Sequence, residues 1–170
     1  MSQQLEHHQI GHIPTKAKLT LVIPELSSPA NLGSIFRIAD AFGVQCIFVT
    51  KNVQQLMQSN RFKRTSRSTE QYLSTKLYSS TENLLKQLQD SGSHLVALEL
   101  TNKSQDISTY HFKNPNMALI IGHEKMGLSE DILEQIKPHL HINMYGNNSS
   151  LNVAQCLGIA LYEISKQSNA

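Results

Sequence analysis

Short continuous apolar runs recur along the chain and alternate with segments in which apolar residues repeat every three or four positions. The runs predict five buried strands, at residues 19–23, 46–50, 76–78, 94–100 and 117–121. The spaced segments predict helices at residues 29–42, 82–89 and 130–137. Strands that alternate with helices and read as unbroken apolar runs are typical of a parallel sheet buried on both faces. The pattern therefore predicts the α/β class, with a mainly parallel, Rossmann-like sheet flanked by helices.

A further apolar segment, residues 142–154, changes character twice within a few positions. Residues 142–144 read as a short strand, and a loop rich in Gly and Asn follows them. From Leu151 the chain reads as a helix that is apolar on nearly every face, and we expect Ser149 or Ser150 to cap it. Such a helix is expected to be buried, in close contact with other backbone or with a second subunit.

The first predicted helix carries polar residues beside its apolar face. That face consists of Leu32, Ile35, Phe36 and Ala39. Asn31, Gly33 and Arg37 lie off it. Because Gly33 precedes Arg37 by one turn, a ligand or another backbone is able to approach beneath the guanidinium. A surface ion pair with Asp40 is the alternative role of Arg37.

Length and composition predict one domain of ordinary size. The chain has 170 residues, 39% of them hydrophobic, which is enough for a full core without disulfides or metals. We expect residues 17–170 to form this domain after a flexible tail at residues 1–16. His7, His8 and His12 in the tail are spaced so that a metal could be bound, but nothing apolar orders the segment, so we predict no metal site.

The two cysteines and the absence of a long apolar run bear on location. Cys46 and Cys156 each lie within an apolar run, which favours buried, reduced thiols over a disulfide or a metal pair. No apolar run is long enough to span a bilayer, and residues 1–10 lack the apolar centre of a secretion signal. We therefore expect a cytoplasmic protein with no membrane partner.

Charge points to one candidate surface. The net charge of +2 is too small to indicate a nucleic-acid partner by itself, because polyanion binding depends on clustered cations. Arg61, Lys63, Arg64 and Arg67 form a dense cluster with no acid before Glu70. Taken alone, the cluster fits a solvated basic loop as well as it fits a phosphate-binding surface.

A glycine-bearing loop follows the fifth predicted strand. Residues 122–129 nearly match the phosphate-binding pattern G-x-x-x-x-G-K-[ST], but Leu128 stands where the lysine is required and Glu124 lies among the amides. The chain also has no G-x-G-x-x-G after a strand. We therefore predict neither a nucleoside triphosphatase nor a Rossmann-type dinucleotide site.

Three segments together resemble a known family. Residues 31–37 (NLGSIFR), residues 119–129 (LIIGHEKMGLS), and residues 142–144 (INM) with 150–154 (SLNVA) resemble the three motifs of the SpoU (TrmH-like) branch of the SPOUT methyltransferases. The resemblance covers the chain from about residue 19 to about residue 165. It implies an S-adenosylmethionine-dependent RNA ribose 2′-O-methyltransferase that works as a homodimer and carries a deep C-terminal trefoil knot.

The resemblance also implies roles for individual residues. Those expected to hold S-adenosylmethionine, largely through main-chain groups, are Leu98, Glu99, Leu100, Gly122, Ile142, Met144, Ser150 and Leu151. Arg37 corresponds to the catalytic arginine, with Asn31 supporting it, Glu124 structuring the second motif, and Ser150 and Asn152 lining the site. A guanidinium keeps its proton in nearly all proteins, so an electrostatic or phosphate-orienting role is physically easier than that of a general base.

The resemblance also shapes the expected substrate. In an RNA enzyme the basic cluster at residues 61–67 becomes a candidate RNA contact. We expect a tRNA substrate, with a guanosine of the D-loop preferred on the basis of residues 65–72 and 99–103. A ribosomal RNA is the alternative substrate. A catalytically silent RNA-binding protein of the same fold is the third possibility, and the intact motif residues argue against it.

Overall fold

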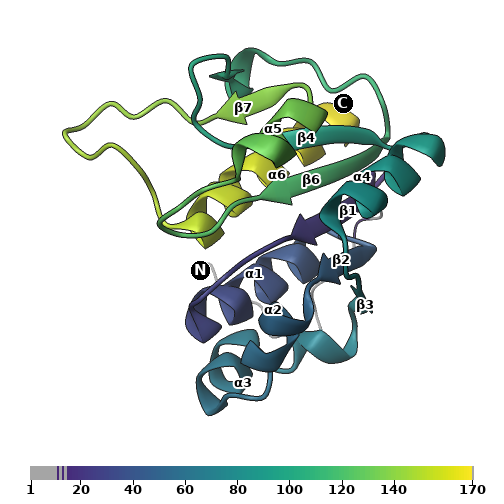
Figure 1. Ribbon diagram of the computed structural model, residues 1–170, viewed down its shortest axis with the longest axis vertical. Coiled ribbons are helices and arrows are strands. Elements are labelled where there is room, and N and C mark those ends of the chain that lie inside the picture. Colours follow the sequence, from purple (N-terminus) through teal and green to yellow (C-terminus); the bar gives the residue numbers. More distant parts are fainter. Residues whose placement is uncertain (1–10, 12, 14, 170) are drawn as a thin grey trace, which may run out of the picture.

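The computed structural model describes residues 11, 13 and 15–169, which form a seven-stranded sheet between two layers of helices (Figure 1). Across the sheet the strands are β3 (Ser74–Leu77), β2 (Cys46–Val49), β1 (Lys18–Ile23), β6 (Asn116–Ile121), β4 (His94–Leu98), β7 (His139–His141) and β5 (Gln105–Asp106). Every pairing is parallel, which confirms the predicted α/β class and the mainly parallel sheet. His7, His8 and His12 lie outside the described residues, as does most of the predicted tail.

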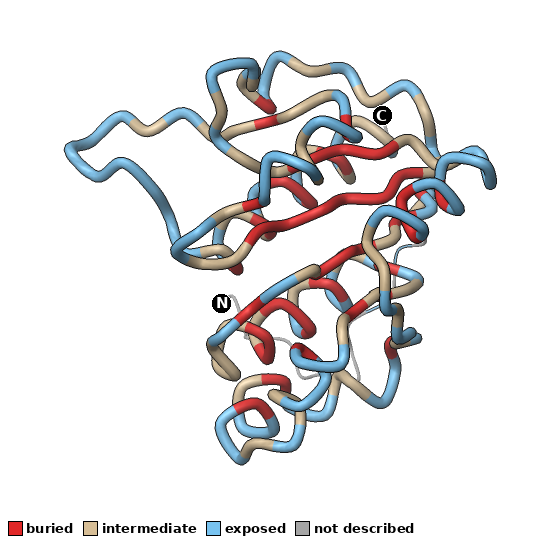
Figure 2. The backbone as a smooth tube through the Cα atoms, viewed as in Figure 1, coloured by how far each residue is buried: buried red, intermediate tan, exposed pale blue. Residues whose placement is uncertain are grey.

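The helices cover both faces of the sheet. One layer holds α1 (Pro29–Ala41) and α6 (Val153–Asn169), with α2 (Lys51–Leu56) and α3 (Asn60–Ser66) beside α1. The other layer holds α4 (Thr81–Asp90) and α5 (Glu130–Gln135). Two single-turn 3₁₀ helices, Thr69–Gln71 and Ile107–Thr109, complete the described part of the chain. Each layer buries its own hydrophobic cluster against the central strands, which are buried along their length (Figure 2).

The start of α1 forms as its sequence predicts. Ser28 is the N-cap, and its hydroxyl accepts a hydrogen bond from the Asn31 amide, while Pro29 occupies the first turn. The buried face contains Leu32, Gly33, Ile35, Phe36 and Ala39. Gly43, at φ +68°, follows the end of the helix. The sheet and this buried face together fix where Asn31 and Arg37 lie.

The basic cluster lies on α3 and not on a loop, so the loop interpretation was wrong. Ser59 caps α3 by accepting a hydrogen bond from the Phe62 amide. Phe62 is buried against Phe36 of α1, with ring centroids 5.3 Å apart in an edge-to-face arrangement. A single buried aromatic residue on a seven-residue helix gives too little periodicity to be recognised in the sequence.

The last strand lies earlier in the chain than predicted. The sequence indicated a strand at residues 142–144, whereas β7 ends at His141. His139 and His141 are hydrogen-bonded through their Nδ1 atoms to the hydroxyls of Thr101 and Ser104, at 3.1 and 2.9 Å. These partners let polar histidines occupy a strand between β4 and β5, which an apolar pattern does not reveal.

Helix α6 differs from its prediction at its N-cap. Asn152, and not Ser149 or Ser150, caps it, because Asn152 Oδ1 accepts a hydrogen bond from the Ala154 amide at 2.9 Å. The helix also buries one face only. Ile159 and Tyr162 are 41% and 62% exposed on the opposite side.

Several further features of the described residues bear on the sequence predictions. Cys46 and Cys156 are free and partly buried. No helix in the described part of the chain has the length and apolarity to cross a bilayer. Among residues 11, 13 and 15–169, no three potential metal-binding side chains gather in one place.

Candidate active site

The candidate site lies at the carboxyl ends of β4, β6 and β7, where a parallel sheet brings its loops together. Glu124, in the loop after β6, reaches across to the start of α1. Its Oε2 accepts hydrogen bonds from the amide and the hydroxyl of Ser27, both at 3.1 Å. Its Oε1 accepts from the Ser28 amide at 2.9 Å and from Asn31 Nδ2 at 3.1 Å. The carboxylate therefore ties the second motif to the first.

These donors determine the charge state of Glu124. Burial by itself would raise the pKa of the carboxyl group, but the hydrogen bonds from its own loop, Ser27, Asn31 and Ser28 outweigh burial and lower the pKa below its ordinary value. The group is consequently ionised at neutral pH and acts only as an acceptor.

Because the Glu124 carboxylate can only accept hydrogen bonds, it fixes the orientation of two side-chain amides, first that of Asn31 and then that of Asn152. Asn31 must turn its Nδ2 toward Glu124, which leaves its Oδ1 to accept from Asn152 Nδ2 at 2.9 Å. Asn152 then has its Oδ1 free to cap α6 through the Ala154 amide. A single directed chain of hydrogen bonds thus joins all three motifs.

Glu99 organises the other side of the site. Its Oε2 accepts from the Leu128 amide at 2.9 Å, and its Oε1 accepts from the Leu100 amide at 3.1 Å. A Cβ on Gly122 would lie 2.5 Å from the Gly127 carbonyl carbon, and one on Gly127 would lie 2.6 Å from Glu99 Oε2. Both positions therefore require glycine, and Gly127 also has a φ of +67°. Close backbone approach is the reason for glycine at 122, and the positive φ beside the Glu99 carboxylate is the reason for glycine at 127.

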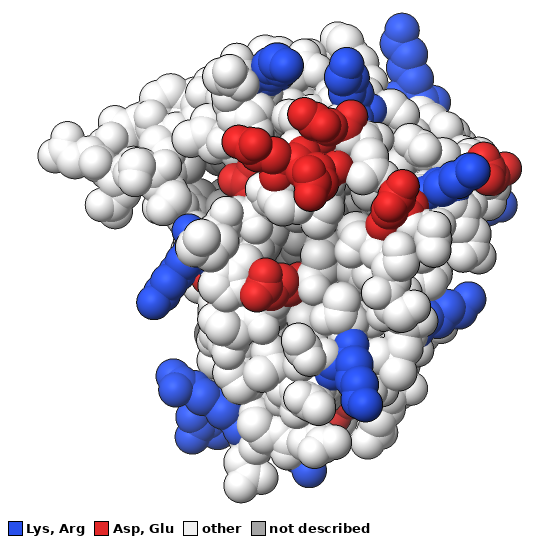
Figure 3. Space-filling model, in the orientation of Figure 1, with Lys and Arg blue, Asp and Glu red and all other residues white. Residues whose placement is uncertain are grey.

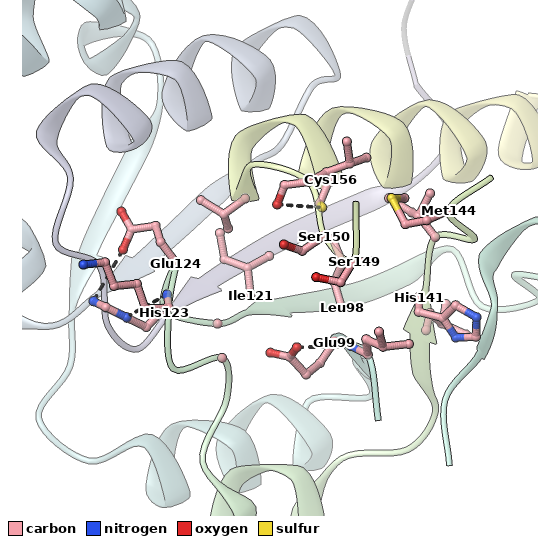
Figure 4. A pocket seen from close by; sticks show the side chains of 18 residues that line it. Leu98, Glu99, Ile121, His123, Glu124, His141, Met144, Ser149, Ser150 and Cys156 are labelled. Atoms are coloured by element: carbon pink, nitrogen blue, oxygen red, sulfur yellow. Dashed lines mark hydrogen bonds and ion pairs between the residues drawn. The ribbon is translucent and has the colours of Figure 1, made fainter. Parts of the chain in front are cut away.

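A pocket of about 260 Å³ lies between these loops (Figure 4). The structure brings to it every residue that the resemblance assigns to the cofactor: Leu98, Glu99, Leu100, Gly122, Ile142, Met144, Ser150 and Leu151. Glu124 also lines it. Asn31 and Asn152 lie beside the pocket through their contacts with Glu124 and with each other.

Sequence reasoning missed several residues of the pocket wall. These are Ile121, His123, Lys125, Gly127, Leu140, His141, Ser149, Val153 and Cys156. Cys156 follows Asn152 by one helical turn, a spacing that places both on one side of the helix start. Burial raises the pKa of its thiol, so the thiol form prevails at neutral pH. His123 lies within the second motif, but its sequence position carries no sign of its contacts.

Arg37 is exposed on α1 and forms no ion pair with Asp40 or with any other described residue, so the predicted surface pair is wrong. Gly33, one turn earlier, lies against α3. A Cβ there would be 1.9 Å from Thr65 Oγ1 and 2.9 Å from the Phe62 carbonyl oxygen. Of the two uses predicted for this glycine, the approach of another backbone is confirmed.

The four basic side chains of α3 and its C-cap are all exposed: Arg61, Lys63, Arg64 and Arg67. They lie at the end of the molecule that carries α1 and Arg37, whereas acidic side chains gather over α5 (Figure 3). The helix crossing permitted by Gly33 therefore places this basic surface on the element that packs directly against α1.

Comparison with known proteins gives a consistent result. The model of the family described as "SpoU rRNA Methylase family" matches residues 18–162. A Synechocystis protein described as an uncharacterized tRNA/rRNA methyltransferase is 32% identical over 91% of this chain and 55% of its own length.

Solved structures resemble the whole fold. An AdoMet-bound rRNA methyltransferase from Sinorhizobium meliloti superposes with a TM-score of 0.78 and 25% identity, covering 88% of this chain and 56% of that one. A structure described for the 2-OH methylation of C/U34 on tRNA gives a TM-score of 0.77 and 27% identity, covering 89% of this chain and 97% of that one. This chain spans only 64%, 61% and 55% of three curated relatives that it matches.

Proposed function

The chain belongs to the SpoU rRNA Methylase family, and on that premise we propose that it is an S-adenosylmethionine-dependent RNA ribose 2′-O-methyltransferase. The observation that carries the proposal is the directed chain from Glu124 through Asn31 to Asn152, beside a pocket lined by all eight predicted cofactor residues. A loop that served only the fold would need neither the fixed orientations of the Asn31 and Asn152 side chains nor a pocket beside them.

The pocket suits this methyl donor. Glu99 and Glu124 line it, but both carboxylates are already hydrogen-bonded by main-chain amides, so apolar side chains and main-chain groups remain to contact a ligand. Such walls fit a nucleoside without phosphates, and no phosphate-binding loop is needed. The cofactor supplies an electrophilic methyl group on a sulfonium. Leu98, Ile142 and Leu151 would hold the apolar parts of the cofactor and exclude water.

The acceptor ribose hydroxyl would lie on the Asn31–Asn152 side of the pocket. Transfer would join the methyl carbon to the ribose oxygen, with the sulfonium leaving as a neutral thioether and the hydroxyl proton passing to solvent. Arg37 has no competing partner among the described residues, so its guanidinium is free to bind the phosphate beside the ribose. Ser150 is exposed at the pocket and supplies a hydroxyl near the reacting atoms. Positioning is thus the main contribution of these side chains.

Replacement of Arg37 tests the assignment. We expect Arg37→Ala and Arg37→Lys to lower the rate of labelled methyl transfer by roughly 100-fold, because misplacement of an acceptor by about 1 Å has effects of that order. The dissociation constant for S-adenosylmethionine, measured by calorimetry, should stay within about threefold of wild type. Near wild-type turnover by Arg37→Ala on its true RNA would refute the role.

We propose tRNA as the substrate, with a guanosine of the D-loop preferred and ribosomal RNA as the alternative. Support for tRNA is the near-complete coverage, 97%, of a solved chain that is described for tRNA methylation. The decisive experiment supplies labelled methyl groups to bulk tRNA and rRNA from a strain lacking this gene, followed by mapping of the methylated position. Neither cofactor binding nor transfer to either RNA would favour the catalytically silent alternative. We place this activity in the cytoplasm, where free thiols such as Cys46 and Cys156 persist.

We further propose that α6 pairs two copies into a homodimer. Ile159 and Tyr162 leave apolar surface exposed on a helix whose opposite face is buried. We expect wild type to elute with the mass of two chains in light scattering and Tyr162→Glu to elute with the mass of one. Lys86→Glu, on the exposed face of α4, is the matched control and should remain dimeric. A monomeric wild type would contradict this arrangement.

The deep knot belongs with these proposals. β7 inserts between β4 and β5, although residues 99–104 join those two strands directly. The hydrogen bonds of His139 and His141 to Thr101 and Ser104 hold β7 against that connection. A knot requires a later segment of the chain, here β7, to cross a connection between two earlier strands, here residues 99–104 between β4 and β5.

A further inference from the structure

His123 is a largely buried imidazole for which the proposed mechanism has no use. Its side chain is 12% exposed, and it occupies the turn at residues 123–127 that forms one wall of the pocket (Figure 4). The turn is closed by two backbone hydrogen bonds, from the His123 amide to the Gly127 carbonyl at 3.1 Å and from the Gly127 amide to the His123 carbonyl at 2.9 Å. The imidazole lies within this closed turn.

Two amides donate to the same ring nitrogen. His123 Nδ1 accepts from the Lys125 amide at 3.2 Å and from the Met126 amide at 3.3 Å. A nitrogen that accepts hydrogen bonds cannot carry a proton, so the proton of the neutral ring is on Nε2. Nε2 lies 3.5 Å from Glu124 Oε2, a carboxylate oxygen that attracts an N–H and repels a lone pair. Both edges of the ring therefore require one and the same tautomer.

We propose that His123, held as the neutral Nε2–H tautomer, is a positioning residue that shapes the turn at residues 123–127 into the cofactor-pocket wall. This inference rests on the proposed function, because the pocket is taken to hold S-adenosylmethionine. His123 acts through others. Its Nδ1 holds the amides of Lys125 and Met126 inward, and its Nε2 edge faces the carboxylate that orients Asn31.

The two ring nitrogens are separable by substitution. In His123→Asn the side-chain Oδ1 occupies the place of Nδ1 and accepts the same two amides. His123→Gln instead extends a polar group toward the place of Nε2, near Glu124, and leaves the two amides without their acceptor. His123→Phe keeps the ring volume and removes both contacts. His111→Asn, at an exposed histidine away from the turn, is the matched control.

Cofactor binding and turnover give the first readout. We expect His123→Asn and His111→Asn to bind S-adenosylmethionine within about threefold of wild type, whereas His123→Gln and His123→Phe bind about tenfold more weakly and transfer methyl on the order of 10- to 100-fold more slowly. Thermal unfolding of each variant separates a folding defect from a binding defect. Equal losses in all three His123 variants, or no loss in any, would overturn the proposal.

The second readout does not depend on activity. In a ¹⁵N-histidine sample, nitrogen resonances report which ring nitrogen bears the proton, and His123→Asn identifies the signal by its absence. We expect an unprotonated Nδ1 and a protonated Nε2 at neutral pH. A proton on Nδ1 would overturn the inference even in an active enzyme. If the wild-type protein showed the expected tautomer but did not bind S-adenosylmethionine, the proposed function would be refuted. The inference about the geometry of the turn would then still stand.

Discussion

Glu124 receives donors from Ser27, Ser28 and Asn31 on a single carboxylate. Hydrogen bonds to a charged acceptor are stronger than those between neutral groups, and the loss of one partner leaves the remaining groups unsatisfied. One side chain therefore sets both the entry of the chain into α1 and the direction of the amide chain toward Asn152.

The lowered pKa of Glu124 predicts how its contribution depends on pH. A carboxyl group whose native pKa lies below its unfolded value stabilises the fold fully above the unfolded pKa, near 4.3, and this contribution is lost as pH falls through the native pKa. Glu124→Gln replaces one acceptor oxygen by a donor that faces other donors. We expect it to lower the free energy of unfolding by about 2 kcal/mol at neutral pH, measured by urea denaturation.

This difference between wild type and Glu124→Gln should shrink as pH is lowered below the unfolded value. Glu25→Gln, at an exposed carboxylate three residues before Ser28, is the matched control and should leave the unfolding energy within about 0.5 kcal/mol of wild type. A Glu124→Gln effect that stayed constant down to acid pH would show that the carboxylate charge is not what the donors recognise.

At the residue scale, the sequence motifs predicted which residues lie together in the site. They could not predict which residue caps α6, because that depends on the direction of hydrogen bonds between distant residues. Asn31, Glu124 and Asn152 were all expected at the site. The sequence predicts Ser149 or Ser150 as the cap of α6 because serine is a good N-cap, yet the Asn152 side-chain amide is oriented by Asn31 and presents its oxygen to α6. That orientation arises from a residue far away in the sequence.

At the scale of elements, two glycines inside helices have opposite surroundings. Gly33 lies against the backbone of α3, whereas a Cβ on Gly158 would meet only the side chain of Ile38, at 3.7 Å. Glycine is therefore required in α1 and is replaceable in α6.

These surroundings predict opposite signs for the same substitution. We expect Gly33→Ala to lower the free energy of unfolding by about 1 to 3 kcal/mol, because the Phe62 carbonyl oxygen cannot move away without shifting α3. Gly158→Ala should raise it by about 0.5 to 1 kcal/mol, since alanine is the better helix former and meets ordinary contact distances. Urea denaturation monitored by circular dichroism measures both. A neutral Gly33→Ala would mean that α3 does not pack this closely on α1.

The central strands could be predicted from the sequence because both of their faces are buried. Continuous apolar runs mark these strands, since helices cover both faces of the sheet. β7 and α3 were misread for a shared reason, since tertiary partners satisfy or bury the few side chains that hold them: Thr101 and Ser104 for β7, and Phe36 for α3. No local pattern encodes such partners.

At the scale of the whole molecule, charge is distributed unevenly although the net charge is small. Basic side chains gather at the α3 end and acidic ones over α5 (Figure 3). An RNA backbone would be attracted to the first region and repelled by the second.

Salt dependence of RNA binding tests this distribution. We expect the triple variant Lys63→Gln, Arg64→Gln and Arg67→Gln to reduce the slope of log K against log salt concentration, by about 0.7 for each phosphate of a single strand that the variant no longer neutralises. Binding isotherms, measured at several salt concentrations on the RNA that the protein methylates, give the slope.

A matched triple variant, Lys86→Gln, Lys113→Gln and Lys137→Gln, removes the same charge from exposed positions elsewhere. It should leave the slope near that of wild type. Equal slopes for wild type and the α3 variant would show that the basic cluster is a solvated surface that makes no contact with RNA.

The packing of α6 on the sheet beside α1 has a consequence for the making of this protein. α1 precedes α6 by most of the described chain, so α1 leaves the ribosome well before α6 does. The apolar surface that the two helices share therefore stays uncovered until α6 has been made. The first half of the described chain depends on a helix that is made much later, so the nascent chain must be shielded from its neighbours until α6 has emerged.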